Sequence, residues 1–289
     1  VLKGLSASTL YGDRGRNGVI LITTKNGSFK GGEKVTVDIS SSVFYTTPHL
    51  PNYQDEFGGG FNQEFGWYFS NWGPAFSDTN PDVYGSYFNK VEDGQVYVNH
   101  PFATNVAPEF IAGYEDLAAS PYAYKPYNSV EDFFRTGLIT NQTVAVKGGT
   151  ENARFSASYS NYKDSGFTPG NELGRDNFGV GGQVKSGKFT LRGTLNYSKT
   201  DYASPPIAAS AGSGVIGSGT SIFGDIMYTP RNVDLIGIPY ERADGGSLYY
   251  RETNGIQHPL WTVQNSKTGQ NVNRVYGSFN ANFRLTENL

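Results

Sequence analysis

Aromatic and amide side chains gather in one short stretch of the sequence and could bind sugar. Trp67, Tyr68, Asn71 and Trp72 fall within six residues. Flat aromatic rings stack on sugar rings, and an amide supplies directed hydrogen bonds. The stretch is therefore a candidate ligand-contact surface, although packing of the rings is the stronger interpretation. The alternative is that these rings pack against one another or against a partner protein, as the rings of aromatic-rich loops commonly do.

A second aromatic stretch offers the same chemistry. Tyr122, Tyr124 and Tyr127 are spaced around Pro121 and Pro126. Tyrosine combines an apolar ring with a polar hydroxyl, which suits both sugar binding and protein contact. We expect these residues to contact either a ligand or a partner protein, and the sequence leaves both open.

The residues that usually carry catalysis are few, so we expect no enzyme activity. The chain has no cysteine, which excludes thiol catalysis and cysteine-based zinc sites. Its three histidines each lie next to, or one residue from, a proline: His49, His100 and His258. No HExxH or GxSxG motif is present.

One segment begins like a calcium-binding loop. Asp78, Asn80 and Asp82 have the alternating spacing of such loops, but Val83 stands where the glycine of the turn belongs. We therefore expect no metal and no cofactor.

Composition excludes one class of partner and leaves one class of fold open. The 289 residues carry a net charge of -3, which argues against nucleic-acid binding because that needs a basic face. Only 17% of residues are charged, and 37 are glycine, 20 tyrosine and 19 phenylalanine. No apolar run reaches the roughly 20 residues of a membrane helix, but a membrane β-barrel needs none because only alternate residues face lipid.

Alternation of apolar and polar residues predicts six strands. Between Phe189 and Tyr197, for example, Leu191 and Leu195 fall on one face while Thr190, Arg192, Thr194 and Asn196 fall on the other. The same pattern predicts strands at about 35–45, 140–148, 152–162, 176–185, 188–198 and 273–286. We expect the arginines on the polar faces to point into the lumen of a barrel or to a plug, namely Arg154, Arg192, Arg274 and Arg284.

The links between these strands alternate between short and long. Two hairpin turns, at 148–152 and 186–187, are rich in glycine, whereas the predicted loops 46–139, 163–175 and 201–272 are long. Outer-membrane barrels have short turns on one side and long loops on the other, and their strands are long, with aromatic residues near the ends. The pattern favours a membrane barrel over a soluble β-sandwich, which stays the alternative. Six strands do not close a barrel, so we expect this chain to be a fragment.

The first 27 residues carry a motif of a different kind. Quoted by position, its parts are Leu2-Lys3-Gly4, Ser6-Ala7, Leu10-Tyr11-Gly12, Arg14-Gly15, Asn17-Gly18-Val19-Ile20 and Ile22-Thr23-Thr24-Lys25. This stretch resembles the end of the plug domain of TonB-dependent outer-membrane transporters, in the form found in the SusC/RagA family of Bacteroidetes. The resemblance continues through Asn71-Trp72-Gly73-Pro74, Asp132 to Gly137, and His258-Pro259-Leu260-Trp261.

The resemblance implies an all-β membrane protein whose plug fills a barrel of about 22 strands. Residues 1–31 would be the end of the plug, and 32–289 the first part of the barrel. Arg14 would contact the barrel wall from the plug. The aromatic candidates, which are Trp67, Tyr68, Asn71, Trp72, Tyr122 and Tyr124, would contact substrate or lid.

The function that the resemblance implies is import of a large nutrient across the outer membrane. The nutrient would be an oligosaccharide or an oligopeptide, captured with a SusD-like surface lipoprotein as lid and driven through TonB, in a dimer of transporter–lid pairs. Two alternatives stay open. One is a SusC-like barrel that serves as a scaffold or binding component of a surface complex, and the other is a soluble β-rich carbohydrate-binding module.

Overall fold

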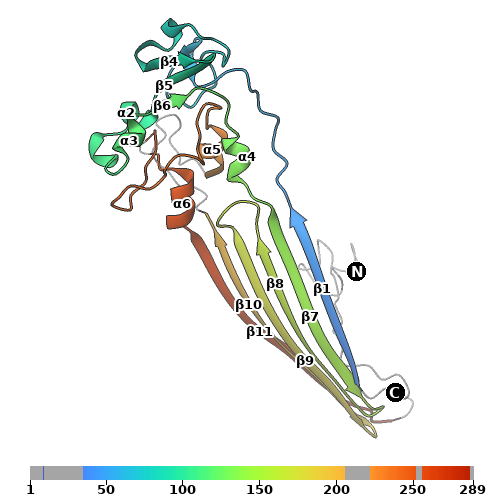
Figure 1. The fold of residues 1–289 in the computed structure, drawn as a ribbon. Helices are drawn as coiled ribbons and strands as arrows, with labels where there is room; N and C mark the ends of the chain where they lie inside the picture. The colour runs from blue at the N-terminus through green and yellow to red at the C-terminus, as the bar shows by residue number, and fades with distance from the viewer. Residues whose placement is uncertain (1–8, 10–34, 206–221, 252–255, 287–289) are drawn as a thin grey trace.

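The computed structural model of the protein describes Thr9 and residues 35–205, 222–251 and 256–286. It has two visibly different regions: a long, slanted sheet and a cluster of short strands and helices at one end of it (Figure 1). The segment 1–31, for which we predict the end of a plug, lies outside the described residues except for Thr9.

The long sheet has six antiparallel strands in the order β1-β7-β8-β9-β10-β11. Their bounds are Val35–Thr46 for β1, Gly137–Gly149 for β7, Ala153–Ser165 for β8, Glu172–Ser186 for β9, Phe189–Ser204 for β10 and Thr268–Phe283 for β11. Each strand pairs with the next strand in this order, and the order contains no crossover. The ladders between paired strands are unbroken. The six antiparallel strands that alternation predicts are confirmed.

The bounds differ from the prediction mainly at the end of the sheet that meets the short elements. There β10 continues to Ser204 instead of ending near 198, and β11 begins at Thr268 instead of 273. The link between β8 and β9 is only 166–171, so the expected loop 163–175 is wrong in length. At the opposite end the turns are as short as predicted, and the second contains Gly187 with a φ of 55°.

The links expected as long loops, 46–139 and 201–272, contain folded structure. We call residues 47–136 and 222–267 the loop domain, as far as they are described. It holds β2 (Gly60–Phe61), β3 (Glu64–Phe65), β4 (Phe88–Glu92), β5 (Gln95–Asn99), β6 (Pro121–Ala123), α2 (Pro101–Asn105), α3 (Glu115–Ala118), α4 (Ser129–Phe133), α5 (Ile222–Met227) and α6 (Pro259–Asn265). Among the described residues, no helix combines the length and apolar character that crossing a membrane requires.

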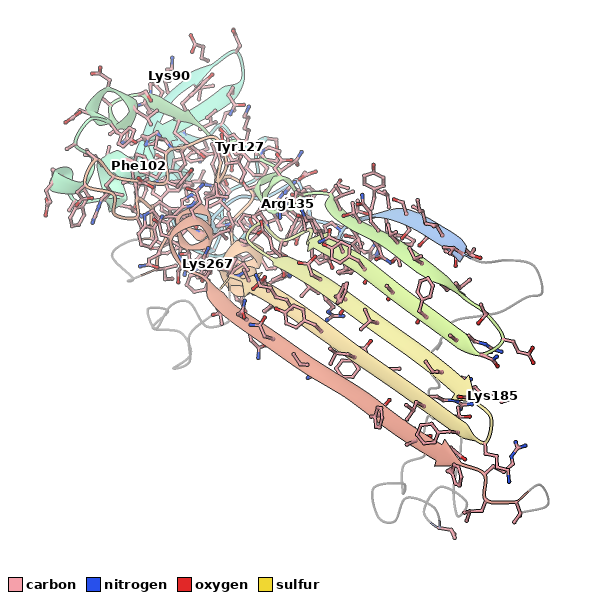
Figure 2. All side chains as sticks on the ribbon, turned by 90° about the horizontal axis from the view of Figure 1, so that it is seen from below. Lys90, Phe102, Tyr127, Arg135, Lys185 and Lys267 are labelled. Atoms are coloured by element: carbon pink, nitrogen blue, oxygen red, sulfur yellow. The ribbon has the colours of Figure 1, made fainter. Side chains whose placement is uncertain are left out.

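Aromatic rings make the core of the loop domain. Phe65, Trp67, Tyr84 and Tyr124 are all at most 6% exposed, and the ring of Phe65 contacts the other three rings with centroids 5.1 to 6.0 Å apart. Figure 2 shows side chains crowded around Phe102 and Tyr127 and spread thinly along the sheet, with Lys185 at its far end. The loop domain thus has a core of its own, whereas no described residue of the six long strands is a buried hydrophobic residue.

Contacts between distant segments hold the loop domain together. Arg231 is buried, and its guanidinium donates to Asp55 and Glu131, at 2.5 and 3.1 Å. The Ser129 hydroxyl donates to the Val233 carbonyl at 2.5 Å. These bonds join the chain before β7 to the chain after β10. The bonds of Arg231 should hold this contact firmly, because charge-assisted bonds to a buried guanidinium are strong and directional.

Candidate functional site

One face of the long sheet is apolar and exposed. In the register, Val37 lies opposite Val146, Ala157 opposite Val180, and Leu195 opposite Gly277. The larger side chains of this face are open to the surroundings, including Val37 (56%), Ile39 (75%), Leu195 (53%) and Phe279 (75%). A soluble protein rarely exposes a continuous apolar surface of this extent, so the face needs an apolar partner or solvent.

A row of aromatic rings crosses this apolar face. Tyr159 lies opposite Phe178, and Phe178 lies opposite Tyr197. The Tyr159 hydroxyl donates to Asp176 at 2.7 Å, and the Tyr197 hydroxyl donates to Asn273 at 2.8 Å. All three rings therefore lie on the apolar side, and the two tyrosine hydroxyls reach toward the loop domain, which is the geometry of a membrane-interface girdle.

Polar residues replace apolar ones immediately beyond the aromatic row. The next row on the same face, toward the loop domain, reads Asn161, Asp176, Lys199 and Asn273. In the other direction the apolar positions continue to the pair Phe189 and Phe283. Tyr197 lies eight residues after Phe189, which is about 26 Å along a strand. The nine residues from Phe189 to Tyr197 match the roughly 9–11 residues with which a tilted strand crosses a bilayer.

The opposite face of the sheet is polar and carries excess positive charge. On the described strands it holds six cationic side chains, Lys147, Arg154, Arg175, Lys185, Arg192 and Arg274, and two acidic ones, Asp38 and Asp164. Lys147 pairs with Asp38 at 2.7 Å. Alternation predicted the polar position of Arg154, Arg192 and Arg274, and the register agrees. Arg284 follows β11, where its backbone N–H donates to the Lys188 carbonyl.

The first aromatic stretch is divided between the interior and the surface. Trp67 is 5% exposed and packs edge-on against Phe65 and Tyr122. Tyr68 and Trp72, by contrast, are 49% and 70% exposed. Asn71 is also exposed, but its side-chain oxygen accepts the backbone N–H of Arg231 at 2.8 Å. In this structure the Trp67 ring offers no face for stacking, so the alternative of packing within the domain describes it.

The exposed rings lie beside the hairpin of β2 and β3. Phe61 contacts Tyr68 with ring centroids 5.1 Å apart, and the Trp72 carbonyl accepts the Gln63 N–H. Asn62 and Gln63, at the tip of the hairpin, both have positive φ, as a tight turn of this type requires. The exposed rings beside this hairpin are therefore those of Phe61, Tyr68 and Trp72.

The second aromatic stretch lies in the core. Tyr122 is 6% exposed, Tyr124 is fully buried, and Tyr127 is half-buried. The Tyr124 hydroxyl donates to the Pro74 carbonyl at 2.7 Å, and the Tyr122 hydroxyl donates to the Asn232 carbonyl at 3.1 Å. Burial raises the pKa of Tyr127 to about 12. These rings hold the loop domain together, and Tyr122 and Tyr124 present no surface to a ligand in this structure.

Two of the three histidines begin helices. Nδ1 of His100 accepts the Phe102 N–H at 3.2 Å at the start of α2, and Nδ1 of His258 accepts the Leu260 N–H at 3.1 Å at the start of α6. In each case a proline occupies the first helical position, where its missing N–H costs nothing. Burial lowers the pKa of His100 to about 4 and that of His258 to about 3. Both rings are therefore neutral caps.

The calcium-like segment makes turns with its own side chains. The Asp78 carboxylate accepts the Asn80 N–H, and the Asn80 side chain accepts the Asp82 N–H. Within the described ranges, no three His, Cys, Asp or Glu side chains come together as a metal site would require. Arg14, for which we predict contact with the barrel wall, lies outside the described residues.

A sheet that is apolar on one face and polar on the other, with an aromatic row at the boundary, is typical of the wall of a transmembrane barrel. No family model matches the chain. A search of curated proteins finds distant similarity to "TonB-dependent receptor P3" of Formosa agariphila, with 24% identity over 214 residues. The match covers 69% of this chain and 16% of that receptor, so the chain spans about a sixth of the relative's length.

Sequence reasoning missed Arg231, and it did not place Arg175 on the polar face. Arg231 follows Pro230 in an irregular segment, and its partners Asp55 and Glu131 are 176 and 100 residues away, so no local pattern marks it. Arg175 could have been found, because it is in phase with the polar face of a strand that alternation did predict.

Proposed function

We propose that this chain forms part of the wall and outer loops of a TonB-dependent outer-membrane importer of the SusC/RagA kind. The observation that carries the proposal is the exposed apolar face of the sheet, opposite a polar face and bounded by the row Tyr159, Phe178 and Tyr197. In a membrane the apolar face would contact lipid and the polar face would line the lumen. The similarity to a TonB-dependent receptor supports the same assignment.

In this proposal the edge strands β1 and β11 pair with further strands of a closed barrel of about 22 strands. Both are edges of the described sheet. Exposed edges of long strands promote aggregation unless another strand pairs with them. Residues 1–31 would belong to the plug, and Arg14 would bridge plug and wall. The loop domain lies at the end opposite the short turns and would face the outside of the cell.

The proposed cargo is an oligosaccharide or oligopeptide, captured with a SusD-like lipoprotein as lid and imported through coupling to TonB. Within the loop domain, the exposed Tyr68 and Trp72 are the predicted residues best placed to contact substrate or lid. Import is a transport activity without catalysis, and the similarity to a receptor favours it over an enzyme.

The test is extraction of the full-length protein from its native membrane in mild detergent, followed by native mass spectrometry and an uptake assay. We expect a much longer chain, a co-purified lipoprotein and a bound oligomer, with uptake that stops when the proton-motive force is dissipated. Uptake that is absent in spite of an intact complex would favour the scaffold function instead. A protein that is soluble and alone without detergent would contradict the membrane assignment.

The soluble carbohydrate-binding module fits the structure poorly. It requires the apolar strand faces to pack into a dry core. Instead, Ile39 and Phe279 on that face are both 75% exposed. The aromatic core that does exist belongs to the loop domain.

A further inference from the structure

A hollow on the polar face of the sheet is lined by hydrogen-bond donors. It has a volume of about 390 Å³, within the range of small-molecule sites. Its lining is Arg175, Asn177, Ser198, Thr200, Val272, Arg274 and Tyr276. The two guanidinium groups come from β9 and β11, on either side of β10, and no carboxylate belongs to the lining.

The strand register holds the two arginines near each other. Arg175 lies opposite Thr200, and Arg274 lies opposite Ser198, two residues away on the same strand and the same face. Nε of Arg175 donates to the Thr200 hydroxyl at 3.2 Å, which orients the guanidinium across β10. The Ser198 hydroxyl donates to Asn177, so the floor of the hollow is itself hydrogen-bonded.

Neither arginine has an acidic partner among the residues that the structure describes. The nearest acid in the register on this face is Asp164, and it accepts from the Tyr162 hydroxyl instead. Two unneutralised guanidinium groups facing one hollow favour an anionic ligand, and a planar guanidinium binds a carboxylate or a sulfate through two parallel bonds. Tyr276, 56% exposed, adds an aromatic ring to the same hollow.

The hollow lies at the level of the aromatic row, at the end of the sheet next to the loop domain. Arg274 precedes Val275, which is the position opposite Tyr197. In the proposed barrel, this end of the sheet is the outer mouth of the lumen. A substrate from outside the cell would therefore reach the hollow before it reached a plug within the membrane.

We infer that this hollow binds an acidic sugar residue of the imported oligosaccharide, with its carboxylate or sulfate on Arg175 and Arg274 and its ring on Tyr276. The inference rests on the proposed function and names the class of cargo. Charge complementarity selects the acid, and the tyrosine ring selects a sugar over a bare anion.

The experiment uses the full-length protein in detergent and measures binding by calorimetry. The probes are an oligogalacturonide, the same oligomer with its carboxylates reduced to alcohols, a sulfated galactan oligomer and an acidic oligopeptide. We expect an acidic oligosaccharide to bind at least tenfold more tightly than the neutral one, with affinity falling as salt rises. The double variant Arg175→Gln/Arg274→Gln should lose that tenfold preference and bind the acidic and the neutral oligomer about equally.

A matched control removes one charge from the same face at the other end of the strand. Arg192 lies on β10, six residues before Ser198, about 20 Å along the strand. Arg192→Gln should keep the preference for the acidic oligomer. Equal binding of acidic and neutral oligomers by the unmodified protein would overturn the inference, and so would a preference that survives the double variant or one confined to the peptide. Such results in a protein that still spans the membrane and imports would leave the proposed function intact.

Discussion

The sheet and the loop domain use the same aromatic residues in opposite ways. In the loop domain, the rings of Tyr84 and Tyr124 are inside, in contact with each other and closed to solvent. On the sheet, Tyr159 and Tyr197 are 47% and 39% exposed, with their rings on the apolar face. The loop domain provides its own apolar interior, whereas the sheet relies on an apolar environment outside the protein. Substitutions should therefore act through packing in one region and through the membrane in the other.

Removal of a ring from the loop domain should have the largest effect. Tyr124 is fully buried, contacts Phe65, Phe76 and Tyr84, and donates to the Pro74 carbonyl. Tyr124→Ala should lower the free energy of unfolding of the loop domain by about 3–5 kcal/mol, because a large cavity replaces the ring. Hydrogen exchange of the β5 and β6 amides in the full-length protein measures this loss.

The matched variant is Tyr124→Phe, which keeps the ring and removes only the hydroxyl. It should cost about 1 kcal/mol, the usual net value of one hydrogen bond. The amides of β9 and β10 should exchange at the unmodified rate in both variants. An equal loss of protection in the sheet would mean that the two regions do not unfold separately.

A charge on the apolar face of the sheet should have the next largest effect. Leu195 lies inside the apolar band, two residues before Tyr197 of the aromatic row, opposite Val180 and Gly277. Leu195→Arg should cost about 2 kcal/mol in a bilayer, between the roughly 2–4 kcal/mol of a cation at the midplane of an outer-membrane barrel and the roughly 0–1 kcal/mol near its interfaces. The measurement is urea unfolding of the full-length protein in lipid vesicles.

The control places the same charge one residue along, on the opposite face. Asn196 lies on the polar face and lines a hollow there. Asn196→Arg should change stability by less than about 1 kcal/mol, because the introduced cation stays in water. If both variants fold equally well in vesicles, the apolar face does not contact lipid.

The same contrast explains how much could be predicted from sequence. The strand from Phe189 to Tyr197 is visible because one of its faces is apolar and the period is two. The continuation to Ser204 is not visible, because Lys199 and Asp201 occupy the outward face beyond the aromatic row. The backbone ladder continues there, but the apolar environment that produces alternation has ended.

The loop domain could not be predicted in the same way. Trp67 and Trp72 are five residues apart in one irregular segment, yet Trp67 is 5% exposed and Trp72 is 70% exposed. What decides between them is packing against Tyr122 and Tyr250, which come from distant parts of the chain. No periodic pattern records such contacts, so a list of aromatic candidates could not separate core rings from surface rings.

Acid should destabilise the loop domain more than the sheet, and the contribution of each single histidine is smaller than the two effects above. His100 and His258 have pKa values of about 4 and about 3 in the folded domain because burial disfavours the charged ring, against 6.5 when unfolded. Between these values the unfolded state binds more protons, so stability is complete above pH 6.5 and falls as the pH falls. Each histidine should remove about 1.5 kcal/mol between pH 6.5 and pH 5.

The variant His258→Asn isolates one of these contributions. Asparagine is a good N-cap, so it can accept the Leu260 N–H in place of Nδ1 without taking up a proton. At pH 7 the variant should be somewhat less stable than the unmodified protein, because the ring also packs against Tyr249. The part of the stability loss from pH 7 to pH 5 that comes from the two buried histidines should be about half as large, since only His100 of the pair remains. An unchanged pH dependence, measured by hydrogen exchange of the loop-domain amides, would show that protonation of His258 does not drive the acid effect.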